Sequence, residues 1–248
     1  MRVLKMTVSY DGTDFCGWQL QPGKRSVQEI VESAILAVTG ESIRTLASGR
    51  TDAGVHAIGQ VVSAASETRL DDQTLCRALN ARLPYDVRIG KLEFAKEGFH
   101  PIRDAKSKRY RYVIQCGGQP NVFRRHFCWH LHQSLDVARM KQAADQLVGQ
   151  IDFASFQAAG APRKSTVRTV FDLDLVEQQV EDESFVTLEI EANGFLYNMV
   201  RIIVGTLVQV GLGKQNPAWI EEVVQGCDRR LAGPTSPPQG LFLLFVRY

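Results

Sequence analysis

An aspartate stands on a predicted tight turn within the peptide ASGRTDAGVHA, residues 47–57. An apolar strand ends at Gly49, and Asp52 follows, with Arg50 two residues before it. A turn at a strand end exposes its side chain to a cleft, where a nearby cation keeps a carboxylate ionised as a nucleophile or base. Aspartate beside glycine also accepts backbone N–H bonds in ordinary turns. This peptide alone slightly favours the ordinary turn.

A single cation lies in the first turn of an apolar helix predicted over 198–210. Arg201 interrupts a stripe formed by Met199, Ile202, Ile203 and Leu207. A buried cation is costly unless it meets an anion, so the pattern predicts an ion pair. A partner within its own domain would make Arg201 structural, whereas pairing with Asp52 would join two distant stretches of chain in one catalytic site.

Tyrosines and arginines alternate in the strand peptide KRYRY, residues 108–112. Tyr110 and Tyr112 fall on one side of the strand, and Arg109 and Arg111 on the other. Such a strand can offer a ring to an unstacked base while the cations meet phosphate. The alternative is an edge strand with half-buried tyrosines.

The loop YDGTDFCGWQLQP, residues 10–22, carries two further aromatic side chains, Phe15 and Trp18. Aromatic faces in a polar, glycine-rich loop suit stacking on bases. Burial of Trp18 beneath its own loop explains the pattern equally well.

Cations gather in three short stretches, although the formal net charge is only +2. Phosphate binding depends on such clusters rather than on total charge. Each cluster alone is more typical of a solvated surface than of an RNA contact. The members are Lys106, Lys108, Arg109 and Arg111 in the first, Arg124, Arg125 and His126 in the second, and Arg163, Lys164 and Arg168 in the third.

Motifs for several other activities are missing from the sequence. The five cysteines form no CxxC pair and the five histidines no HExxH motif, so neither a disulfide framework nor a zinc site is indicated. No P-loop, dinucleotide-binding or serine-hydrolase motif occurs. The N-terminal MRVLKMTVSY lacks the features of a signal peptide, and residues 195–212 are too short and polar to cross a bilayer. We therefore expect a cytoplasmic protein without a membrane role.

Apolar periodicity predicts an α+β fold for the first half of the chain. Residues 3–10 alternate as a strand, and Ser26 with Glu29 forms a capping-box pattern before a helix at 27–39. Strands at 43–48, 59–65 and 86–94 and a helix at 72–82 complete the series. The order strand, helix, strand, strand, helix, strand is that of a ferredoxin-like antiparallel sheet.

A second α+β set is predicted after the polar, basic segment 99–107. Its strands are expected at 108–115, 166–176, 184–192 and 241–247, and its helices at 135–148, 198–210 and 217–226. We therefore divide the chain into domains 1–103 and 104–248. Two ferredoxin-like, RRM-like halves with mainly antiparallel sheets are expected to join around a central RNA-binding cleft.

Five peptides together resemble the bacterial tRNA pseudouridine synthase A family. Their order and spacing match over almost the whole chain, and five ordered fragments are far more specific than any one. The peptides are YDGTDFCGWQLQP at 10–22, GRTDAGVHA at 49–57, KRYRY at 108–112, FLYNMVR at 195–201 and PPQGLFL at 237–243.

This resemblance implies an isomerase that converts uridine to pseudouridine at positions 38, 39 and 40 in the anticodon stem-loop of tRNA. It implies a homodimer without a metal or an organic cofactor. Asp52 matches the nucleophile, Tyr110 the tyrosine that stacks on the target base, and Arg201 the arginine that pairs with the nucleophile. Arg50 matches the arginine that assists base flipping.

The resemblance also implies an apolar wall and further contacts to RNA. Leu241 and Leu243 match the apolar wall near the pocket. Family members often read FHARF where this chain has Phe99–Arg103, so the family's RNA-contacting arginine is displaced by one residue, and Arg103 is its candidate substitute. The predicted substrate contacts are Arg50, Arg103, Tyr110, Arg163, Lys164, Arg168, Leu241 and Leu243.

A uridine inside an RNA stem must be flipped out before it can react, and stacking and phosphate contacts offset that cost. The sequence leaves open whether Asp52 attacks the sugar C1′, adds to C6 of the base or removes a sugar proton. Two other functions also fit the pattern, namely a non-catalytic RNA-binding module and a uridine-specific base glycosylase. Glycosidic cleavage normally uses two carboxylates, and the motif around Asp52 shows only one.

Overall fold

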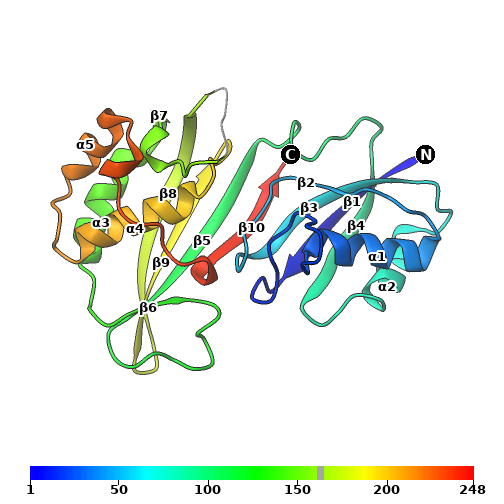
Figure 1. Ribbon diagram of the computed structural model, residues 1–248, viewed down its shortest axis with the longest axis horizontal. Coiled ribbons are helices and arrows are strands. Elements are labelled where there is room, and N and C mark those ends of the chain that lie inside the picture. Colours follow the sequence, from blue (N-terminus) through cyan, green and yellow to red (C-terminus); the bar gives the residue numbers. More distant parts are fainter. Residues whose placement is uncertain (161–164) are drawn as a thin grey trace. The chain divides into compact units, whose positions relative to one another are not determined.

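The computed structural model describes residues 1–160 and 165–248, and the chain forms two compact units (Figure 1). The first unit comprises Met1–Lys106 together with Phe242–Tyr248, and the second comprises Ser107–Leu241. From the sequence we placed the domain boundary after residue 103 and assigned the last strand to the second domain. In the structure this strand extends the first unit's sheet, because Phe242 and Leu243 pair with His56 and Ala57.

The first unit has the expected ferredoxin-like order of elements. These are β1 (Arg2–Tyr10), α1 (Val27–Thr39), β2 (Leu46–Ala47), β3 (His56–Ser66), α2 (Asp72–Asn80) and β4 (Val87–Ala95). Strand β1 is central and runs antiparallel to both β3 and β4. The other edge of β3 is shared by antiparallel β2 at one end and parallel β10 (Leu241–Arg247) at the other. The mainly antiparallel α+β class is confirmed.

Local sequence explains the elements of this unit. In β1, Leu4, Met6, Val8 and Tyr10 are buried in strict alternation. The hydroxyl of Ser26 accepts a hydrogen bond from the Glu29 amide and caps α1, which ends at Gly40 in the left-handed conformation. The sheet and the apolar face of α1 therefore form one core, from which the loops before and after α1 emerge.

Within its described residues, the second unit combines a five-stranded sheet with three α-helices. Its elements are β5 (Ser107–Cys116), β6 (Trp129–Leu131), α3 (Val137–Ala144), β7 (Gly149–Asp152), β8 (Val167–Val180), β9 (Glu183–Ala192), α4 (Met199–Gly211) and α5 (Trp219–Gly226). Strands β5, β9, β8 and β7 follow one another in antiparallel pairs, and β6 lies parallel to β5. The short strands β6 and β7 were not predicted, because three or four residues show no measurable periodicity.

Helix α4 is the buried helix of the second unit. Its apolar residues are almost fully enclosed, and the Thr206 hydroxyl donates to the Ile202 carbonyl while accepting the Gly233 amide. Gly205 lies against the chain that follows α5, so that a side chain there would meet the Pro234 carbonyl oxygen. Within the described residues, no helix has both the length and the apolar character needed to cross a membrane.

We predict that Gly205→Ala destabilises the protein by about 1–3 kcal/mol, as overpacking of a tight core does. The new Cβ would stand 1.8 Å from the Pro234 oxygen, which belongs to backbone and cannot turn aside. Denaturant unfolding measures the change. Gly194→Ala is the control, because its Cβ would meet only the flexible Arg168 side chain at 3.7 Å. Equal stability of the two variants would contradict this packing.

Candidate functional site

Asp52 lies on the turn that leads into the start of β3. Its side chain is half-buried, whereas the neighbouring Thr51 and Val55 side chains point inward and are buried. The Val55 amide donates to the Asp52 carbonyl at 3.1 Å and closes the turn. Gly54 has φ +77°, a left-handed conformation that glycine adopts without strain. The turn therefore holds Asp52 half-buried on a fixed backbone.

The loop between β1 and α1 holds this turn in place through backbone and side-chain hydrogen bonds. The Trp18 amide donates to the Thr51 carbonyl at 3.0 Å, and the Gly54 amide donates to the Phe15 carbonyl at 3.4 Å. A third bond runs from the Gly12 amide to Nδ1 of the buried His56, at 3.0 Å. The segment carrying Asp52 is thus secured before, beside and after the aspartate.

Two glycines of the same loop allow this loop and the Asp52 turn to approach each other closely. A Cβ at Gly17 would stand 2.5 Å from the Thr51 oxygen, and one at Gly12 would stand 2.1 Å from the Val55 oxygen. Gly17 also has φ +101°, where side chains are disfavoured. Both positions therefore require glycine for steric reasons.

The aromatic residues of this loop are structural. Trp18 is 2% exposed and Phe15 is 3% exposed, so the burial interpretation holds and base stacking by these rings is excluded in this conformation. The Arg25 guanidinium lies 4.0 Å above the Phe15 ring and forms two hydrogen bonds with the Asp86 carboxylate, at 2.8 and 3.0 Å. These contacts connect the end of the loop, at Arg25, with Phe15 and with Asp86.

In the second unit, Tyr110 lies on the buried side of β5. It is 8% exposed and meets Phe195 edge-on, with ring centroids 5.0 Å apart. The neighbouring inward residue, Tyr112, is fully buried and donates its hydroxyl proton to the Pro237 carbonyl at 2.7 Å. Burial raises the pKa of Tyr112, so it stays neutral at ordinary pH.

Arg201 is oriented by groups of its own unit. Its Nε donates to the Ser236 carbonyl at 2.7 Å, and its Nη1 donates to Oδ1 of Asn198 at 3.0 Å. The Ser236 amide in turn donates to the Arg201 carbonyl at 3.1 Å. The guanidinium plane is therefore fixed by at least two donors, which a lysine could not reproduce.

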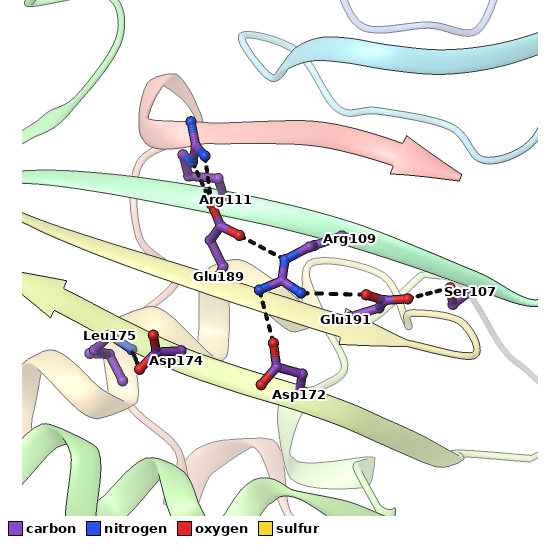
Figure 2. Close-up of polar contacts among 8 residues, drawn as sticks. All are labelled: Ser107, Arg109, Arg111, Asp172, Asp174, Leu175, Glu189 and Glu191. Atoms are coloured by element: carbon purple, nitrogen blue, oxygen red, sulfur yellow. Dashed lines mark hydrogen bonds and ion pairs between the residues drawn. The ribbon is translucent and has the colours of Figure 1, made fainter. Parts of the chain in front are cut away.

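The outward arginines of β5 bind carboxylates of the neighbouring strands, and Figure 2 shows this network. Arg109 contacts Glu189 at 2.7 Å, Asp172 at 2.8 Å and Glu191 at 3.4 Å. Arg111 contacts Glu189 at 2.6 Å. Burial raises the pKa of Glu189, but hydrogen bonds from Arg111 and Arg109 outweigh it and hold the pKa below its ordinary value of 4.5. Both guanidinium groups are therefore engaged with carboxylates of the same unit, and their contact with phosphate stays a prediction.

The remaining predicted residues have varied surroundings. Arg50 and Arg103 are exposed, whereas Leu241 and Leu243 are buried, Leu243 within the pair of β10 and β3. Nη1 of Arg168 donates to the carbonyls of Ser165 and Val167, at 3.1 and 2.6 Å. Arg163 and Lys164 lie outside the described residues. No group of three or more potential metal ligands occurs among residues 1–160 and 165–248.

Sequence reasoning missed the polar side chains beneath the Asp52 turn. Tyr10, Ser48, Thr51 and Gln60 are all buried and hydrogen-bonded to one another or to the turn. The position of Gln60 could have indicated this group, because Gln60 is a polar residue within an otherwise apolar stretch of β3. A buried polar group needs a partner, so its position pointed to a neighbouring loop.

Comparison with known proteins identifies close relatives. A family model described as tRNA pseudouridine synthase matches residues 6–100 and 143–248. A protein named tRNA pseudouridine synthase A from Thermoanaerobacter sp. (strain X514) is 43% identical over 248 residues, covering 100% of both chains. Proteins of the same name are 45% identical in Brevibacillus brevis, covering 100% of both chains, and 42% identical in Bacillus subtilis, covering 99% of this chain and 98% of the other.

We predict that Glu189→Gln lowers the free energy of unfolding at neutral pH by about 1–3 kcal/mol, because two arginines lose a charged acceptor. The folded-state pKa of Glu189 is lowered, so its contribution is present above the ordinary pKa of 4.5 and is lost as the pH falls further. The difference between wild type and variant should therefore shrink as the pH is lowered from about 5 to about 3.

Denaturant unfolding at several pH values measures this difference. The matched control is Asp174→Asn, because Asp174 lies near the network but accepts a hydrogen bond only from the Leu175 amide in Figure 2. A difference between wild type and Glu189→Gln that stays constant down to about pH 3 would contradict the charged pairing.

Proposed function

This chain belongs to the tRNA pseudouridine synthase family and isomerises uridine in tRNA, and we propose that its targets are positions 38, 39 and 40 of the anticodon stem-loop. The observation that carries the catalytic part of this proposal is the turn of residues 49–56, which holds Asp52 half-buried on a fixed backbone. The order and spacing along the sequence of the peptides that carry Asp52, Tyr110 and Arg201 support the same assignment.

We propose that Asp52 is the nucleophile of the isomerisation. The reaction breaks the bond between uracil N1 and the sugar C1′ and forms a bond between uracil C5 and C1′. The proton leaves C5 and N1 gains one, so the product has the same atoms as the substrate and no oxidant or reductant is consumed. A carboxylate held in a fixed position suits the first step, because a preorganised nucleophile avoids the cost of orientation.

We propose that Tyr110 and Arg201 serve the same flipped uridine. The edge contact with Phe195 fixes the Tyr110 ring, which is suited to stacking on an extruded base. The bonds from Arg201 to Ser236 and Asn198 fix the direction of its positive charge, which would balance the Asp52 carboxylate during the reaction. Leu241 and Leu243, both buried, form the apolar wall near the pocket in this proposal.

We propose that five cations contact the tRNA phosphates. Arg50 and Arg103 are exposed, and we propose that both bind the RNA backbone, together with Arg163, Lys164 and Arg168. A homodimer that needs no cofactor completes the proposal. Light scattering of the pure protein would distinguish the mass of two chains, which this proposal expects, from the mass of one.

We predict that Asp52→Asn abolishes pseudouridine formation, to below about a thousandth of the wild-type rate, because the amide cannot replace an anionic nucleophile. The assay uses unmodified tRNA with tritium at uridine C5, and a chelator is present. Wild type should release tritium, and the variant should bind tRNA as tightly as wild type. Asp14→Asn removes one negative charge from an exposed position in the adjacent loop and is the control.

Each other outcome of this assay identifies a different function. Undiminished tritium release by Asp52→Asn would show that another group is the nucleophile. Free uracil or abasic RNA would identify a base glycosylase. Tight, salt-dependent tRNA binding by wild type without any change in the RNA would identify a binding module.

We predict that Arg201→Lys lowers the rate of isomerisation by about 10- to 100-fold, because lysine keeps the charge but cannot maintain both fixed hydrogen bonds. Single-turnover kinetics measure this rate. Arg229→Lys is the control, because Arg229 also bonds a neighbouring loop, through Ala232 and Thr235, at 3.3 and 3.2 Å. A full rate in Arg201→Lys would show that the charge alone suffices.

A further inference from the structure

Four buried polar side chains lie beneath the Asp52 turn and form two hydrogen-bonded pairs. The Tyr10 and Thr51 hydroxyl oxygens lie 2.7 Å apart. The Ser48 hydroxyl donates to Oε1 of Gln60, and Nε2 of Gln60 donates to the Gly49 carbonyl, both at 2.8 Å. All four side chains belong to residues that are at most 6% exposed.

This group links the rigid sheet to the turn. Tyr10 is the last residue of the central strand β1, and Gln60 lies within β3. The bonds reach the turn on both sides of Arg50, at Gly49 and at Thr51. Thr51 points inward and immediately precedes Asp52, so fixing the Thr51 side chain fixes the Cα position of the aspartate.

Burial of hydroxyls is costly, and apolar side chains of similar shape would fill the same space. Removing a hydroxyl from water is offset only when it finds a well-placed partner. Phenylalanine and valine would pack in place of Tyr10 and Thr51 without that requirement. The hydrogen bond between the two hydroxyls therefore fixes the orientation of the Thr51 side chain, which apolar packing would not do.

We propose that Tyr10 and Thr51 are positioning residues that orient the Asp52 carboxylate toward the reacting uridine, with Ser48 and Gln60 supporting the turn from below. This inference rests on the proposed role of Asp52. Neither hydroxyl contacts RNA, and both act through the backbone of the turn. Burial raises the pKa of Tyr10 to about 12, so the pair stays neutral and intact throughout the neutral pH range.

The test compares variants that remove or keep each hydroxyl. We expect Tyr10→Phe and Thr51→Val each to lower the single-turnover rate of tritium release about tenfold, while the dissociation constant for tRNA changes less than about twofold. Thr51→Ser keeps the hydroxyl and should recover most of the rate. An equal loss in Thr51→Ser and Thr51→Val would overturn the proposal.

A double variant tests whether the two hydroxyls act together. Because one hydrogen bond joins them, Tyr10→Phe combined with Thr51→Val should be no slower than either single variant. A rate lowered about a hundredfold, the product of two independent effects, would overturn the proposal. So would a loss of tRNA affinity that accounts for the lower rate, because it would indicate an RNA contact.

Ser66→Ala provides the matched control for lost stability. Ser66 is a buried hydroxyl at the far end of β3, and it donates to Glu41 at 2.6 Å. This variant should lose stability and keep the wild-type rate. If Tyr10→Phe does not fold, the comparison between Thr51→Ser and Thr51→Val decides the question alone.

The same assay separates failure of this inference from failure of the proposed function. If wild type releases no tritium, or if Asp52→Asn releases it normally, the proposed function fails. If wild type is active, Asp52→Asn is inactive and both hydroxyl variants react at the wild-type rate, only the positioning role fails.

Discussion

The close approach of two loops in the first unit is the constraint on which the rest of the site depends. Gly12 and Gly17 bring the loop after β1 so near the Asp52 turn that any side chain would collide with backbone. Hydrogen bonds from the Trp18 and Gly12 amides then fasten the two loops together. The aspartate is consequently placed by the folded unit itself and does not require RNA for its position.

Charge in the second unit is organised differently on the two sides of β5. On one side, Tyr110 and Tyr112 are buried against apolar neighbours. On the other side, Arg109 and Arg111 are neutralised by Glu189 and its neighbours. This network stiffens the strand that carries Tyr110. Alternation along β5 thus places the ion-pair network on one face of the strand. Tyr110, which is proposed to stack on a base, lies on the other face.

The sequence predicted the long, regular elements well, since periodicity identifies which face of an element is buried. Helix α1, with its Ser26 cap, and the alternating strand β1 are confirmed. It could not predict that β10 would join the first unit, because a strand's pattern does not name its pairing partner. The surroundings of Arg109 and Trp18 were also ambiguous. Residue type alone does not reveal whether an arginine pairs with a carboxylate or whether an aromatic ring is buried in a core.

The central claim is that the Asp52 turn is already ordered in the free protein, and amide hydrogen exchange tests it most directly. The amides of Trp18, Gly54 and Val55 form the hydrogen bonds that hold the turn. They should exchange slowly in the free protein, at rates close to those of β1 and β3, and change little when tRNA binds. Rapid exchange of these amides in the free protein, with protection only after tRNA is added, would contradict the account.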